Sequence, residues 1–300
     1  HKYAFLHKDE NGPLTDGNRK TYLNGNGNGN GNGNGEIGLV EYLNGYPIRP
    51  GLFHTNGAYV VSNGVSFTVT SIGAERVELA LFRRFEKEPF VTLPFPPSCK
   101  IGNVYSMIVF DLDYVDLEYC YRVDGPYKPE KGLIFDGDRY CLDPYGLAIT
   151  GQSEWRVKRD RSDYRSRIVW TNFDWQETRN PEIRMEDLVI YELHVRGFTR
   201  HESSGVRHPG TFAGLIEKIP YLLELGVNCV ELMPVFEFNE MLDERYYEGK
   251  QLIDYWGYNP ISFFAPNTSY SSNKEHHEEG TELKKLIREL HRNGIEVILD

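Results

Sequence analysis

Two patterns of apolar and polar residues divide the chain. Between residues 45 and 150, short runs alternate with a period of two, and Gly, Pro and Asp separate them. Such alternation is typical of half-buried antiparallel strands. The runs are 65–70, 76–82, 104–112 and 117–123. They predict an immunoglobulin-like β-sandwich of about a hundred residues, a common domain size.

From residue 186 onward, strand-like and helix-like segments follow one another. The pattern predicts strands at 188–195, 227–233 and 295–299, and amphipathic helices at 212–225 and 282–292. Asn293-Gly294 is a helix stop. The order β-α-β-α-β predicts a parallel sheet. Because the chain ends directly after the third strand, which would leave an open apolar edge, we expect it to be a fragment.

Residues 1–44 are expected to form a flexible arm. Residues 24–35 alternate strictly between Asn and Gly, so they offer no apolar face and keep the backbone as free as possible. We interpret this tract as a spacer. Residues 151–185 are polar and predict a connector between the sandwich, 45–150, and the α/β unit, 186–300.

Composition and charge narrow the possible functions. The chain has 33 Lys and Arg against 44 Asp and Glu, a formal net charge of −11, which argues against a nucleic-acid partner. Its four cysteines lie far apart without a CxxC pair, which predicts free thiols in a reducing compartment and no metal site. The apolar runs are too short for a membrane span or a signal peptide. We therefore expect a cytoplasmic protein, with no motif for a cofactor.

Seven short blocks, in order, resemble one known family. The blocks 189–199, 210–212, 225–240, 255–266 and 291–300 resemble the opening strands and loops of the barrel in the isoamylase branch of the alpha-amylase superfamily, glycoside hydrolase family 13. Upstream, 121–127 and 142–145 resemble the N-terminal starch-binding-type sandwich of isoamylases and glycogen debranching enzymes. The resemblance thus runs from about residue 45 to residue 300.

This resemblance implies a multidomain protein, a β-sandwich followed by the first part of a (β/α)8 TIM barrel. It implies a retaining hydrolase that cleaves α-1,6-glucosidic branch links in α-glucans such as glycogen, amylopectin or limit dextrin. In the family, the nucleophilic Asp, the acid/base Glu and the stabilising Asp follow the fourth, fifth and seventh strands. We therefore expect all three beyond Asp300, and no activity from the 300 residues alone.

Three residues are candidates for the site. The resemblance implies that Tyr258 stacks on the glucose unit being cleaved, since a fixed ring orients the apolar face of a sugar. Trp256 is a second candidate for substrate binding. The alternative for both is that they plug the barrel mouth. Asp300 matches the first acid of a family motif after strand three, which implies support by hydrogen bonding; the alternative is a loop or helix-capping carboxylate.

Other polar residues favour structural roles. Glu192, His194 and Arg196 share one face of the first predicted strand, and we interpret them as a buried polar network rather than a catalytic cluster. Glu237 and Glu240 could be read as an acid pair, but in the family this loop does not supply the acids, so structural or rim positions are expected. The connector tryptophans are expected to dock against the barrel; they are Trp155, Trp170 and Trp175.

Two other functions stay open. An α-glucan branching enzyme or glucanotransferase would share the sandwich and barrel, although the loop at 238–240 and the insertion at 241–252 favour debranching. A non-catalytic glucan-binding or regulatory isoamylase-like protein would keep the fold without the acids. The presence or absence of the acids downstream would separate the non-catalytic protein from the hydrolase.

Overall fold

The computed structural model describes residues 15–16, 19–20, 40–150, 154–160, 163–170, 172–242, 244–275 and 278–300. The Asn-Gly tract and most of the predicted arm lie outside the described residues. Within the arm, β1 (Thr15–Asp16) and β2 (Arg19–Lys20) pair as an antiparallel ladder.

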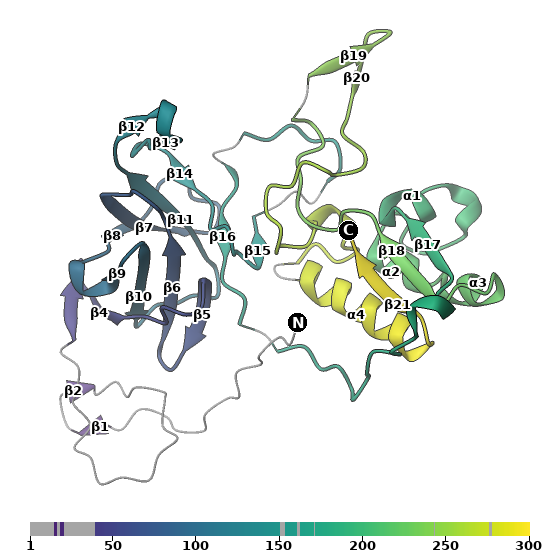
Figure 1. The fold of residues 1–300 in the computed structure, drawn as a ribbon, viewed down its shortest axis with the longest axis horizontal. Helices are drawn as coiled ribbons and strands as arrows, with labels where there is room; N and C mark the ends of the chain where they lie inside the picture. The colour runs from purple at the N-terminus through teal and green to yellow at the C-terminus, as the bar shows by residue number, and fades with distance from the viewer. Residues whose placement is uncertain are drawn as a thin grey trace.

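The predicted β-sandwich is confirmed as two antiparallel sheets (Figure 1). The first has the order β3-β4-β10-β6-β5, with β9 beside β10; its strands are β3 (Glu41–Leu43), β4 (Tyr46–Pro50), β5 (Gly57–Val61), β6 (Gly64–Thr70), β9 (Lys100–Ile101) and β10 (Val104–Phe110). The second has the order β15-β16-β11-β7-β8, with β14 beside β11; its strands are β7 (Arg76–Arg83), β8 (Val91–Pro94), β11 (Leu117–Asp124), β14 (Tyr140–Cys141), β15 (Ala148–Ile149) and β16 (Ser166–Arg167).

The sandwich core lies between the two sheets because alternate residues of each strand point inward. Phe67 and Met107 from the first sheet meet Leu79, Leu81 and Tyr119 from the second, and all five side chains are fully buried. The rings of Phe67 and Tyr119 pack edge to face with centroids 5.1 Å apart. Burial of each such side chain stabilises the fold by about 1.5–3 kcal/mol.

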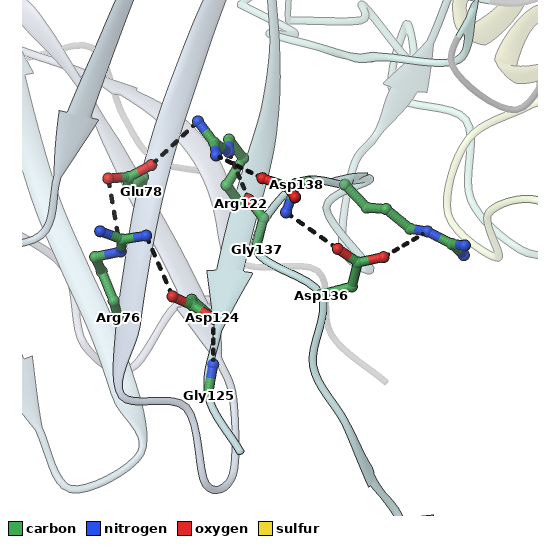
Figure 2. A network of polar contacts seen from close by, with 9 residues as sticks. Arg76, Glu78, Arg122, Asp124, Gly125, Asp136, Gly137 and Asp138 are labelled. Atoms are coloured by element: carbon green, nitrogen blue, oxygen red, sulfur yellow. Dashed lines mark hydrogen bonds and ion pairs between the residues drawn. The ribbon is translucent and has the colours of Figure 1, made fainter. Parts of the chain in front are cut away.

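The central strands β7 and β11 carry a chain of charges, shown in Figure 2. Arg76 pairs with Asp124 at 3.2 Å and with Glu78 at 3.8 Å, and Arg122 pairs with Glu78 at 3.7 Å. The Arg122 Nε also donates a hydrogen bond to the Gly137 carbonyl at 2.8 Å, which ties the following loop to the sheet. The pairs are partly exposed, so each contributes less than about 1 kcal/mol.

The strands and 3₁₀ turns that belong neither to the two sandwich sheets nor to the parallel sheet are short. They are β12 (Tyr127–Lys128), β13 (Leu133–Ile134) and the 3₁₀ turns Pro97–Cys99, Pro129–Lys131, Met185–Asp187, Glu202–Ser204 and Thr268–Tyr270. A hairpin, β19 (Arg245–Tyr247) and β20 (Lys250–Leu252), projects from the second unit (Figure 1).

The second unit confirms the predicted parallel sheet. β17 (Ile190–Leu193), β18 (Cys229–Leu232) and β21 (Glu296–Leu299) pair in parallel in the order β17-β18-β21. α4 (Glu278–Arg292) precedes β21, and its Leu286 and Leu290 are buried in one cluster with Val230 and Leu232 of β18. This is the beginning of a β/α barrel, and it follows the sandwich as predicted.

Two predicted elements differ in the structure. The strand predicted at 188–195 ends at Leu193, because the His194 side chain accepts a hydrogen bond from the Gly197 amide and caps α1 (Val195–Thr199). The helix predicted at 212–225 is two pieces, α2 (Phe212–Ile216) and α3 (Ile219–Glu224). Pro220, in the first turn of α3, has no N–H and its ring would clash with a carbonyl one turn earlier, so a single helix is excluded.

The sandwich and the barrel unit are in direct contact. Arg167 of β16 forms a buried ion pair with Glu279 of α4. The Tyr145 and Phe264 rings stack with centroids 5.4 Å apart. β16 falls within the range predicted as a connector, 151–185, yet it pairs with β11 and β15. The domain boundaries drawn from the sequence stay predictions.

Candidate functional site

The three parallel strands end at one edge, which is where α/β barrels build their sites. Beyond β17 and β18, the Met233 amide donates a hydrogen bond to the Leu193 carbonyl at 3.0 Å. Beyond β18 and β21, the Asp300 amide donates to the Leu232 carbonyl at 3.1 Å. The backbone pairing therefore continues past the last strand residue and fixes Asp300 at this edge.

Tyr258 and Asp300 meet at that edge. The Tyr258 hydroxyl donates a short hydrogen bond to Asp300 Oδ2. This hydrogen bond, reinforced by the charge of Asp300, raises the pKa of Tyr258 to about 12, because both favour the protonated phenol. The Tyr258 side chain is 53% exposed, so its ring stays accessible although its hydroxyl is held.

Trp256 lies beside Tyr258. Their rings are nearly perpendicular, at 83°, with centroids 6.4 Å apart, and Trp256 is 62% exposed. The two rings thus form an open aromatic corner next to the Asp300 carboxylate. An apolar surface beside a carboxylate acceptor is suited to a sugar, which presents an apolar C–H face and hydroxyl donors.

Gly257 sets the conformation of the loop between these two rings. It has a φ of +89°, which favours glycine, and a Cβ at this position would lie 2.7 Å from the buried Phe238 ring. The Gly257 amide donates to Asp254 Oδ1 at 3.1 Å, and an isolated bridge pairs Phe238 with Pro260. The loop that presents Trp256 and Tyr258 is therefore anchored on both sides.

His194 is a structural residue. Its Nδ1 accepts from the Gly197 amide at 3.0 Å, so the proton sits on Nε2, which donates to the Tyr255 carbonyl at 2.7 Å. Burial lowers the pKa of His194, so the imidazole is neutral. The predicted buried network holds for His194 alone, because Glu192 is exposed and Arg196 lies over the Trp155 ring instead.

Trp155 docks into the barrel unit, as predicted. Its ring stacks on Tyr270, with centroids 5.9 Å apart, and packs edge to face against Phe238 and Tyr255. The Arg196 guanidinium lies 4.4 Å from the ring centroid.

Trp170 and Trp175 make different contacts. Trp170 packs against Tyr114, which follows β10 of the sandwich, so the prediction of barrel docking is wrong for this residue. Trp175 packs on Phe173, and the Phe173 ring in turn lies under Arg288 of α4.

Glu237 and Glu240 are structural, as predicted. Both are fully buried. Glu237 Oε2 accepts from the Thr268 amide at 2.7 Å, and burial raises the pKa of Glu237 to about 7. Glu240 accepts a short hydrogen bond from the Arg156 amide. Both carboxyl groups therefore hold loops in place.

The described part of the chain contains no cluster of three His, Cys, Asp or Glu side chains that could hold a metal ion. All four cysteines are free thiols. None of the helices in the described ranges has the length and apolar character needed to cross a bilayer.

The sequence predicted the members of this site but not their contact. Tyr258 and Asp300 are 42 residues apart, and the only signal for their meeting is that each follows a strand of the same parallel sheet. The anchoring role of Gly257 was missed as well; a glycine between two aromatic residues was the available signal.

Comparison with known families matches two models to the chain. Residues 54–146 match carbohydrate-binding module 48, the isoamylase N-terminal domain, and residues 153–300 match the alpha amylase catalytic domain. The first range covers the sandwich from β5 to β14, and the second covers the unit with the parallel sheet together with β16.

Similar proteins include enzymes of plants and bacteria. Isoamylase 1, chloroplastic, of Oryza sativa subsp. japonica is 39% identical over 257 residues, which cover 81% of this chain and 32% of that protein. A glycogen debranching enzyme of Yersinia enterocolitica is 35% identical over 263 residues, covering 81% of this chain and 38% of that protein. The chain thus spans about a third of the length of these curated relatives.

Solved structures agree. The pullulanase from Paenibacillus barengoltzii in complex with maltohexaose and alpha-cyclodextrin has a TM-score of 0.63 and 26% identity, covering 82% of this chain and 37% of that one. The order of sandwich and parallel sheet, the matched family models and these relatives agree with one another. The chain thus combines a match to carbohydrate-binding module 48 with a match to the alpha amylase catalytic domain, and isoamylases and glycogen debranching enzymes are among its relatives.

Proposed function

We propose that the protein carrying this chain hydrolyses α-1,6-glucosidic branch links in glycogen or starch-type glucans, including limit dextrin, with retention. The observation that carries this proposal is the aromatic corner of Trp256 and Tyr258 beside Asp300, at the edge where parallel strands end. The names of the relatives, isoamylase and glycogen debranching enzyme, support it. So does the maltohexaose complex of the pullulanase.

In this proposal the chain's own residues bind and orient the substrate. The Tyr258 ring packs on the apolar face of one glucose unit, and Trp256 contacts a neighbouring unit. Asp300 holds the Tyr258 hydroxyl and accepts hydrogen bonds from sugar hydroxyls. The covalent step requires a carboxylate nucleophile and a carboxylic acid flanking the bond, roles that the family resemblance assigns to later barrel strands.

We also propose that the sandwich, residues 45–150, is a glucan-binding module, joined by residues 151–185 to the barrel unit, 186–300. We propose that the protein works in a reducing compartment, the cytoplasm in a bacterial setting; the four free thiols, three of them buried, support this. Titration of accessible thiols in the native and unfolded protein tests this, since a disulfide would lower the total below four.

Activity of the full-length protein tests the main proposal. We expect new reducing ends from limit dextrin and pullulan, and none from linear maltohexaose, which has no branch link. Branch links that remain intact in limit dextrin would refute hydrolysis. Formation of new branch links without new reducing ends would identify a branching enzyme. Retention on a glucan-containing gel without any turnover would identify a non-catalytic binding protein.

A further inference from the structure

A concave site lies on the barrel unit, and its lining does not include Tyr258, Trp256 or Asp300. It is an open pocket of about 400 Å³ between α1, the loop before α2 and the turn at Thr268–Tyr270, with Trp155 on one side. Its volume is in the range of small-molecule sites. The lining residues used below are Arg196, Arg200, Arg207, Ser271 and Lys274.

The pocket concentrates positive charge in an acidic chain. Four Lys and Arg side chains line it, together with His208, against the single carboxylate of Glu154. Arg196 is half-buried over the Trp155 ring, and desolvation together with the charge of Arg200 lowers its pKa. Within the described ranges, neither Arg196 nor Arg200 forms an ion pair. Arg207 pairs with Glu217 at 3.4 Å, at the exposed rim.

One further polar group, the Ser271 hydroxyl, points to a ligand oxygen, and the Lys274 ammonium, whose donors are taken by the carbonyls of Thr268, Ser269 and Ser271, adds a positive charge beside it. Ser271 is 1% exposed, and its hydroxyl has no hydrogen-bond partner. A buried hydroxyl without a partner costs free energy, so a ligand acceptor would relieve that cost. The Lys274 ammonium is fixed at the same turn, where it donates to the Ser271 carbonyl at 2.5 Å. The turn therefore holds a cation and a free donor side by side.

These features fit one ligand chemistry. Two guanidinium groups without ion pairs match the planar, paired oxygens of a phosphoryl group or a carboxylate. A phosphate monoester has a charge near −2 and three terminal oxygens, so it engages both arginines and the serine hydroxyl, whereas one arginine satisfies both oxygens of a carboxylate. The chain's net charge of −11 disfavours a nucleic-acid polyanion, and the pocket is concave rather than an extended stripe.

We propose that this pocket, formed by Arg196, Arg200, Ser271 and Lys274, binds the phosphoryl group of a phosphorylated sugar. The sugar is either a free hexose phosphate or a phosphate ester carried on a glucan chain. The inference does not depend on the proposed hydrolysis, because it concerns binding at a different group of residues.

Calorimetric titration of the full-length protein tests the proposal at low ionic strength, about 50 mM, where anion binding is least screened. The probes are inorganic phosphate, glucose 6-phosphate, a phosphorylated maltooligosaccharide and neutral glucose. We expect the phosphorylated probes to bind and glucose not to bind. Binding of glucose 6-phosphate indicates a free hexose phosphate, and binding of the oligosaccharide alone indicates an ester on a glucan.

Three variants separate a specific site from general charge. Arg200→Gln is expected to weaken binding about tenfold, since a charge-assisted hydrogen bond is lost. Ser271→Ala removes the hydroxyl without removing any hydrogen bond of the free protein, so it should weaken binding and leave the melting temperature unchanged. Arg139→Gln makes the same charge change on the sandwich and should leave binding unchanged.

Either of two results would overturn the proposal. One is that no phosphorylated probe binds at about 10 mM, a concentration far above that of a specific site. The other is that Arg139→Gln weakens binding as much as Arg200→Gln, because the attraction would then come from overall charge. Circular dichroism of each variant verifies that the fold is kept before its binding is compared.

Discussion

The Tyr258 hydroxyl donates its hydrogen bond to Asp300 across the end of the parallel sheet. Tyr258 belongs to the long loop after β18, whereas Asp300 directly follows β21. The contact therefore connects a loop to the rigid end of a neighbouring strand. It fixes the orientation of the ring without covering its faces, which are the surfaces a sugar would use.

Asp300→Asn should lower the pKa of Tyr258 from about 12 toward its ordinary value of 10.0. The carboxylate disfavours the negatively charged phenolate, and an amide carries no charge. NMR of ¹³C-labelled tyrosine reports the titration, with Tyr258→Phe to assign the resonance. A pKa that stays near 12 in the variant would show that Asp300 is not the cause.

Two substitutions at Tyr258 separate the ring from its hydroxyl in the full-length protein. Tyr258→Ala removes the ring, so KM for a branched dextrin should rise about tenfold. Tyr258→Phe keeps the ring and loses the bond to Asp300, so KM should change little while kcat falls several-fold. Steady-state kinetics measure both. Equal KM values for the two variants would contradict stacking by the ring.

Gly257→Ala should destabilise the protein by about 3 kcal/mol. The positive φ costs about 1–2 kcal/mol for alanine, and the new Cβ meets the buried Phe238 ring. Gly249→Ala is the matched control: it has a φ of +71° and no atom within 4 Å of the new Cβ. Urea unfolding compares the two, and equal losses would show that Phe238 does not constrain the loop.

The buried pair of Arg167 and Glu279 should be costly to break on one side. Arg167→Met leaves Glu279 buried without its cation, which costs about 3–5 kcal/mol. Burial raises the pKa of Glu279 even with Arg167 in place, so removing the cation makes the charged carboxylate still more costly. The double variant Arg167→Met with Glu279→Gln should recover much of the loss. Chemical unfolding of the parent and both variants measures these losses, and a loss under about 1 kcal/mol for Arg167→Met would contradict the prediction.

Glu237 should make stability depend on pH. Burial raises its pKa from 4.5 to about 7, so the folded state prefers the protonated acid. The contribution of protonated Glu237 to the free energy of unfolding is fully present below pH 4.5 and is lost as pH rises through about 7. Glu237→Gln should be more stable than the parent at pH 8 by on the order of 2–3 kcal/mol, and equal to it near pH 4. Urea unfolding from pH 4 to pH 8 measures the free energy of unfolding of both proteins. A difference that stays constant with pH would argue against the raised pKa of Glu237.

The sequence predicted the fold where one local pattern dominates. Strands such as 65–70 and 76–82 alternate cleanly because one face is buried, and their observed bounds differ by a residue or less. Helix ends were harder. The break near Pro220 follows from local chemistry, yet the apolar periodicity of 212–225 continues through it and concealed it. The end of the first parallel strand depends on a cap made by a side chain, His194, which periodicity does not report.

The sequence predicted which residues belong to the site, but not which of them touch one another. Tyr258 and Asp300 stood out through family resemblance, but their hydrogen bond requires β18 and β21 to be neighbours in three dimensions. The charged pocket was not predicted at all. Arg196 and Lys274 lie 78 residues apart, on segments that the helix and turn geometry brings together. The position of an arginine in the sequence does not show whether a carboxylate will lie beside it in the fold.

The contacts of Arg167 with Glu279 and of Tyr145 with Phe264 have a consequence for long substrates. A buried ion pair and a ring stack at the surface hold the two units against each other, which restrains the spacing between their surfaces. Any α-glucan held by both the sandwich and the edge near Tyr258 would therefore span a set number of glucose units. The distance between the two surfaces would then set the shortest glucan chain that can reach both.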